Sequence, residues 1–124
     1  MKLHLDKSQS LNTVTGYGDG YFEINATRYQ HSIVLMPTGP ITAWPVSEFS
    51  QLNGEHFLAM LGRQPEVILV GTGRRQRFIH PRLWAALAER HLGVEAMDSA
   101  AACRTYNILM TEGRQVLAAL LIEA

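Results

Sequence analysis

Val67-Ile68-Leu69-Val70-Gly71-Thr72-Gly73 joins a continuous apolar run to an abrupt glycine turn. Such a run is typical of a strand that is covered on both faces of a sheet. Further along, apolar runs at 94–97 and 116–122 alternate with helical stripes at 82–91 and 99–112. This alternation predicts an α/β sheet, with right-handed crossovers between its parallel strands and both helices packed on it.

The first half of the chain has a different pattern, in which short predicted strands are separated by turns. Predicted strands at 13–17 and 21–25 flank Gly16-Tyr17-Gly18-Asp19-Gly20, where the glycines permit the positive φ of a tight reversal. The chain then continues with these predicted elements: a turn at 25–27, a strand at 29–36, a short strand at 41–44 and a short helix at 54–61.

The composition is that of a globular protein. Hydrophobic residues make up 47% of the 124 residues and charged residues 18%, and this length suits a single domain spanning residues 1–124. Eleven basic residues balance eleven acidic ones, so no overall field attracts nucleic acid or an anionic membrane. We therefore expect no nucleic-acid partner.

The cysteine content and the N-terminus indicate a cytoplasmic protein. A single cysteine, Cys103, excludes an internal disulfide and fits a reducing compartment. Asp6 and Lys7 interrupt the apolar run that a signal peptide needs. The longest apolar run, at 116–122, is too short to span a bilayer, so we expect no transmembrane segment.

Three parts of the sequence together resemble one family. These parts are Gly16-Tyr17-Gly18, residues 67–73, and Met97-Asp98-Ser99-Ala100-Ala101-Ala102-Cys103-Arg104-Thr105-Tyr106-Asn107-Ile108-Leu109 with Glu112-Gly113-Arg114. Over residues 10–122 the chain is similar to the Mth-like domain family of unknown function, which is shared with the mitochondrial NADH dehydrogenase (complex I) assembly factor three. Ser99 stands where threonine is expected, but either residue caps a helix.

The resemblance implies a fold and a class of function. The implied fold is a three-layer α/β domain with a central mixed β-sheet, flanking helices and an added N-terminal β-hairpin. Bacterial members of the family have no assigned reaction. The mitochondrial relative looks like a non-catalytic assembly factor that acts through protein contacts, a role that fold alone does not transfer.

The turn Gly71-Thr72-Gly73 permits two interpretations. A dinucleotide-binding fingerprint needs a third glycine where Gln76 stands, and its helix should follow at once. The simpler interpretation is therefore a tight turn by which the chain leaves the sheet. The alternative is an anion site, in which the helix starting at Ser99 directs N–H groups at the turn and Thr72, Arg74 and Arg75 complete a cradle.

No catalytic constellation is evident in the sequence. Cys103 lies one turn into a helix but lacks a phosphatase-type arginine, because Leu109 occupies that position, so a buried apolar role is expected. The catalytic residues stay unknown, and we predict neither a cofactor nor a metal. The histidines, which show no paired metal-ligand spacing, are His4, His31, His56, His80 and His91.

These observations favour a non-enzymatic protein-interaction or assembly-type module. The stretch Arg74-Arg75-Gln76-Arg77 is either a solvated loop or a partner-facing patch. The alternative function is a small-anion or small-metabolite binding protein or enzyme that uses the crevice between Gly71-Thr72-Gly73 and the Ser99 helix. A homo-oligomer is compatible with the sequence. Within the last helix, we expect Tyr106, Asn107 and Met110 not all to face water, and Asn107 to be hydrogen-bonded.

Overall fold

The computed structural model describes residues 11–123. The prediction that residues 1–7 are not a signal peptide lies outside these residues, as does the prediction for His4. Within the described range, no helix combines the length and the apolar character needed to cross a membrane.

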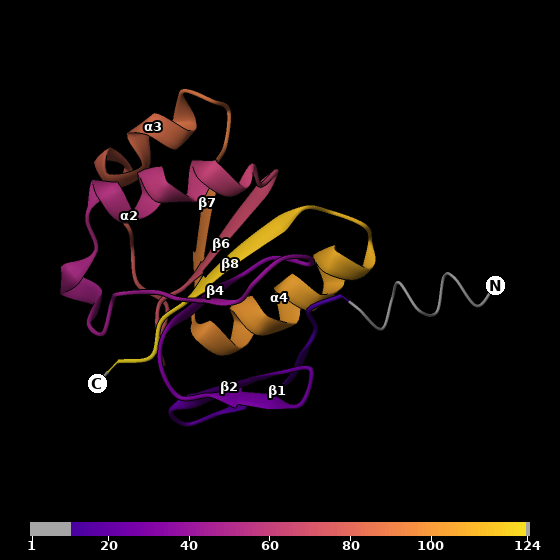
Figure 1. Ribbon diagram of the computed structural model, residues 1–124. Coiled ribbons are helices and arrows are strands. Elements are labelled where there is room, and N and C mark those ends of the chain that lie inside the picture. Colours follow the sequence, from indigo (N-terminus) through magenta and orange to yellow (C-terminus); the bar gives the residue numbers. More distant parts are fainter. Residues whose placement is uncertain (1–10, 124) are drawn as a thin grey trace.

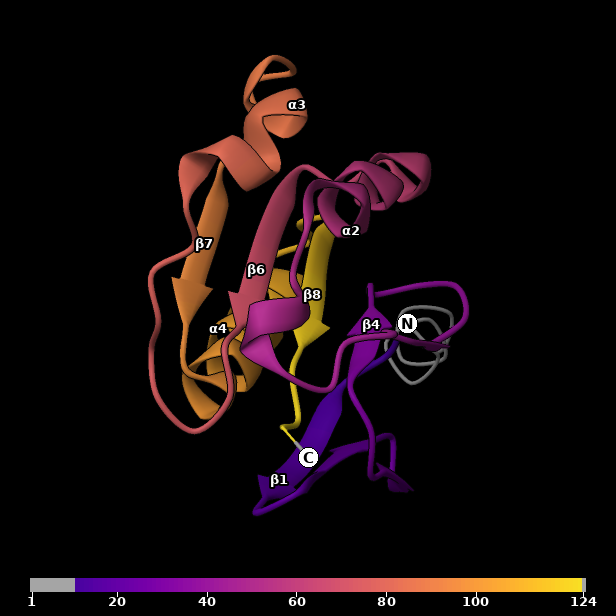
Figure 2. The same ribbon diagram turned by 90° about the vertical axis from the view of Figure 1, so that its left-hand side faces the viewer.

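A five-stranded mixed sheet forms the centre of the fold. Its strand order is β5-β4-β8-β6-β7, and β7, β6, β8 and β4 can be followed in this order across Figure 2. β6, β7 and β8 run parallel, and β4 pairs antiparallel with both β8 and β5. The strands are β4 (Ile33–Leu35), β5 (Thr42–Ala43), β6 (Val67–Gly71), β7 (Val94–Met97) and β8 (Val116–Leu120).

Helices cover both faces of this sheet, as Figure 1 shows. The chain moves from β6 outward to β7 and then back past β6 to β8. Because crossovers are right-handed, this reversal of direction places the two connections on opposite faces. The face opposite α4 (Ser99–Thr111) carries α2 (Gly54–Leu58) and α3 (Ala85–Ala88), with the 3₁₀ turns η1 (Phe49–Gln51), η2 (Ala59–Arg63) and η3 (Pro81–Trp84) joined to them.

A second, three-stranded sheet packs against α4. It consists of β1 (Val14–Gly18), β2 (Tyr21–Ile24) and β3 (Thr27–Tyr29), all antiparallel. Tyr106 and Met110 of α4 are buried, and Asn107 is half-buried and hydrogen-bonded, as predicted. The predicted α/β class, with a central mixed sheet, flanking helices and an added hairpin, is confirmed.

Two predicted elements are wrong in detail. The single strand expected at 29–36 is divided between β3 and β4, which belong to different sheets. Ser32, between them, is buried and bonds Ile122 through its hydroxyl, a distant contact that local sequence does not reveal. The helix expected at 82–91 is only η3 and α3, because Trp84, with φ −120° and ψ 27°, leaves the helical region.

Candidate functional site

A crevice lies at the carboxyl ends of the three parallel strands. It has a volume of about 820 Å³, within the range of ligand sites, and open α/β sheets place their ligands at this end. One wall is the tip of the β1–β2 hairpin, and the other comprises the segments that follow β6, β7 and β8. Its lining residues are Tyr17, Gly18, Asp19, Gly20, Gly73, Arg74, Asp98, Ser99, Ala100, Leu121, Ile122 and Glu123.

The structure brings to the crevice three of the six residues that the sequence suggested for an anion site. Gly73, Arg74 and Ser99 line the crevice, whereas Gly71, Thr72 and Arg75 do not. Gly71 instead permits close packing, since a Cβ there would lie 2.8 Å from the Ser99 Cα. The N-terminus of α4 is thereby held against the end of β6.

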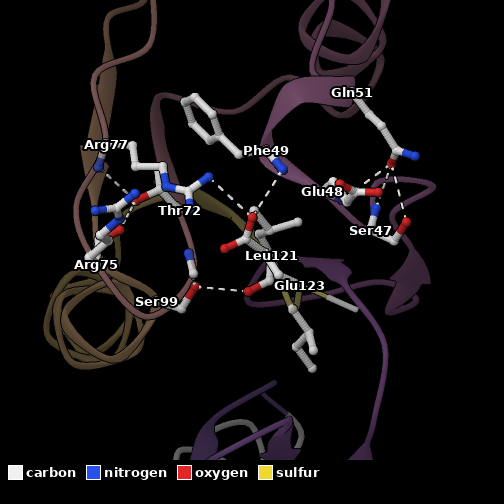
Figure 3. Close-up of polar contacts among 12 residues, drawn as sticks. Ser47, Glu48, Phe49, Gln51, Thr72, Arg75, Arg77, Ser99, Leu121 and Glu123 are labelled. Carbon is white, nitrogen blue, oxygen red and sulfur yellow. Dashed lines mark hydrogen bonds and ion pairs between the residues drawn. The ribbon is translucent and has the colours of Figure 1, made fainter.

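The Ser99 hydroxyl joins three chain segments (Figure 3). Its Oγ accepts a hydrogen bond from the Gly73 N–H at 2.9 Å and donates to the Leu121 carbonyl at 3.0 Å. The Ser99 N–H donates to the Gly73 carbonyl at 2.8 Å. These bonds satisfy the Ser99 hydroxyl and the Gly73 N–H within the protein, so neither group is free to hold a ligand.

Thr72 organises the loop that follows β6. Its side chain is fully buried, and its Oγ1 lies 2.7 Å from the Arg75 carbonyl. The same oxygen accepts from the Arg77 N–H at 3.0 Å. Thr72 therefore fixes the base of the loop and does not contribute to the crevice.

The first turn of α4 has one N–H group without a partner. Asp98 Oδ1 caps the helix by accepting from the Ala101 N–H at 2.8 Å, and the Asp98 carbonyl accepts from the Ala102 N–H. The Ser99 N–H is bonded to Gly73. Among the described residues, the Ala100 N–H alone of these four groups has no bonded acceptor.

Residues 74–78, here called the arginine loop, carry both charge and an exposed aromatic ring. Arg74 forms a largely exposed ion pair with Asp19 of the hairpin at 2.7 Å. Arg77 pairs with Glu123 at 3.2 Å, and its guanidinium lies 5.2 Å from the centre of the Phe49 ring. Arg75 is exposed, and Phe78 is 73% exposed although Ile79 beside it is buried.

Cys103 lies in the core. Burial raises the pKa of its thiol to about 12, and the nearby Arg104 offsets only part of that effect. A nucleophilic cysteine needs a lowered pKa and access to solvent. Cys103 has neither, as expected from the sequence.

Sequence reasoning missed one wall of the crevice and the exposed aromatic residue. Tyr17 and Asp19 are far from Ser99 in the chain, and only tertiary packing brings the hairpin to the strand ends. Phe78 follows Arg77 directly in the chain. The available signal was that this apolar residue lies among charged ones and belongs to no helical or strand pattern.

Comparison with known proteins places the chain in a family. Residues 14–121 match the family described as "Protein of unknown function (DUF498/DUF598)". The chain belongs to this family. The predicted family resemblance is thus confirmed. A protein of Bordetella pertussis, described as an Mth938-like domain, is 40% identical, with a TM-score of 0.80 over 93% of this chain and 88% of that one.

Two other similar proteins are informative. A crystal structure from Bordetella parapertussis is 50% identical, with a TM-score of 0.88 over 92% of this chain and 98% of that one. NADH dehydrogenase [ubiquinone] 1 alpha subcomplex assembly factor 3 of Bos taurus is 32% identical over 110 residues, or 87% of this chain. The matched part spans 59% of that assembly factor's length.

Proposed function

We propose that this protein is a non-enzymatic interaction module of assembly type, which binds a partner protein through the arginine loop. The observation that carries the proposal is Phe78, whose ring is 73% exposed on a loop fixed at both ends. Thr72 holds the start of the loop and buried Ile79 anchors its end. Aromatic and arginine side chains on a rigid support are typical of residues that dominate binding energy.

The kinship to assembly factor 3 supports the same proposal, since that relative's name describes assembly. As finer proposals, the partner is a protein and not a nucleic acid, and the complex forms in the cytoplasm. Cell fractionation followed by detection of the native chain tests the location.

The experiment compares two double variants of the full chain. Arg75→Ala with Phe78→Ala removes the exposed loop side chains, and Arg82→Ala with Ile108→Ala removes a similar exposed pair elsewhere. A partner protein captured from the native extract is purified. The Kd of its complex is then measured with the wild-type chain and with each of the two double variants. We expect the loop variant to weaken binding about tenfold or more, and the control to bind as wild type does. Equal Kd values for all three proteins would overturn the proposal.

A small-anion site in the crevice is the second candidate, with Arg74 and the first turn of α4 as its proposed ligands. The other residues that the sequence suggested, Gly71, Thr72, Gly73, Arg75 and Ser99, would shape or flank this site without holding the anion through the groups described above. The free Ala100 N–H at the start of α4 favours it. The carboxylates of Asp19, Asp98 and Glu123 in the lining oppose it. Phosphate titration followed by amide NMR tests whether this site exists. Chemical-shift changes at 71–75 and 99–102 that are lost in Arg74→Ala with Arg75→Ala would support the site. Changes spread over all arginines would reject it.

A further inference from the structure

The hairpin wall of the crevice carries an unpaired strand edge. Asn25 and Ala26, between β2 and β3, both have positive φ, 50° and 69°, as in the type I′ turn of a two-residue hairpin. The residues that flank such a turn, Ile24 and Thr27, exchange backbone hydrogen bonds. Alternation along the strands then directs the N–H and C=O of Phe22 toward β3 as well.

Tyr17 stands opposite Phe22 in the β1–β2 register. Because Phe22 bonds toward β3, Tyr17 has no backbone partner in β2, and its N–H and C=O point out from the free edge of β1. Val14 provides an independent check, since it stands opposite Ile24 and its outward N–H and C=O are both bonded to the Asn107 side chain. Asn107 thus occupies one pairing position on this edge and leaves the Tyr17 position open.

The open position faces a crevice whose charges are already compensated. Asp19 is paired with Arg74, Glu123 with Arg77, and Asp98 with the first turn of α4. The Tyr17 ring is held by a hydrogen bond from Arg104 to its hydroxyl at 2.9 Å. What the crevice offers is therefore a strand edge, the free Ala100 N–H opposite and apolar surface from Ile122.

We propose that the crevice accepts an extended, uncharged segment of a partner polypeptide, which pairs through its main chain with Tyr17 at the free edge of β1. Strand addition to an exposed sheet edge is an established mode of peptide recognition, in which main-chain bonds give affinity and alternate side chains give specificity. The inference rests on the proposed protein-binding function and adds a contact separate from the arginine loop. An apolar side chain of the segment lies against Ile122.

The probe is a phage-displayed library of random linear peptides, selected on the purified full chain. Enriched peptides are resynthesised with single N-methyl groups along the backbone. We expect one N-methylation, at the peptide residue that pairs with Tyr17, to weaken binding by about threefold to tenfold, because it removes the main-chain hydrogen bond to the Tyr17 carbonyl. The Tyr17 amide should exchange with deuterium more slowly in the complex.

Paired variants locate the bound peptide. Ala100→Phe fills the crevice, whereas Thr111→Phe places the same ring at the exposed far end of α4. We expect peptide binding to be lost in the first and kept in the second, with similar melting temperatures. Three outcomes would each overturn the inference: binding that survives Ala100→Phe, N-methylation that has no effect at any position of the peptide, or a selection that enriches no peptide. The peptide selection uses no cell extract, so its failure would leave the test of the arginine loop unaffected. A failure of the arginine-loop test would likewise leave the peptide experiment unaffected.

Discussion

Asn107 hydrogen-bonds both backbone groups of Val14, although 93 positions separate them in the chain. Its Oδ1 accepts from the Val14 N–H at 3.0 Å and its Nδ2 donates to the Val14 carbonyl at 2.8 Å. The side-chain amide thus takes the place of a neighbouring strand and fixes the small sheet to α4. Together with the hydrogen bond from Arg104 to Tyr17, it positions the hairpin wall of the crevice.

Replacing Asn107 with leucine should destabilise the protein by about 1–3 kcal/mol, because both Val14 groups lose their partner in a partly buried position. Urea unfolding followed by circular dichroism measures the change. Ile108→Ala, at the exposed neighbouring position, is the control and should stay within about 0.5 kcal/mol of wild type. An unchanged midpoint for Asn107→Leu would show that the two bonds contribute nothing net.

Gly71→Ala should destabilise by about 1–3 kcal/mol, since its Cβ would lie 2.8 Å from backbone of Ser99 and the helix must shift. Gly93→Ala is the matched control, because a Cβ there meets nothing within 4 Å. We expect the control to be neutral or more stable by about 0.4–1 kcal/mol. Equal melting temperatures for the two variants would contradict the close contact of β6 with α4.

Cys103 should resist alkylation at pH 8 in the folded protein and react at once in guanidinium chloride. Its pKa rises from 9.0 to about 12 on folding, so the unfolded chain releases the thiol proton first. The stabilising contribution is therefore complete below about pH 9 and is lost as the pH rises toward 12. Burial raises the pKa of Tyr106 in the same direction. Cys103→Ala should flatten the fall of stability with pH over this range, and an unaltered slope would argue against the shift.

Arg77 and Arg75 should differ in their effects on stability. Arg77→Ala removes a partly buried ion pair with Glu123 and packing on Phe49, with an expected loss of about 1 kcal/mol. Arg75→Ala removes an exposed side chain and should leave the melting curve unchanged. Differential scanning calorimetry measures the melting temperatures of both variants. Similar values would show that Arg77 does not stabilise the fold more than the exposed Arg75 does.

The central part of the fold was predictable because its signals are local. The apolar runs gave β6 and β7, and Asp98 with Gly113 bounded α4 closely. The break between β3 and β4 could not be predicted from the sequence, because it depends on a hydrogen bond between Ser32 and Ile122, 90 positions away.

The candidate site was half predictable for the same reason. Parallel strand ends meet at one edge, which brought Gly73 and Ser99 together as expected. The hairpin wall depends on Asn107 and Val14, and no local pattern indicates that pairing. The engagement of Thr72 by Arg75 and Arg77 likewise appears only once the loop has closed on itself.

The position of β8 has a kinetic consequence. This strand lies between β4 and β6, yet it follows every other strand in the chain. Until residues 116–120 have left the ribosome, β4 and β6 expose bare edges and the sheet exists as two halves. Formation of the native sheet is thus tied to the latest and least local pairing, which slows folding and leaves the nascent chain open to aggregation meanwhile. A domain with this strand order therefore leaves strand edges unpaired during synthesis for longer than one whose last strand lies at the edge of the sheet.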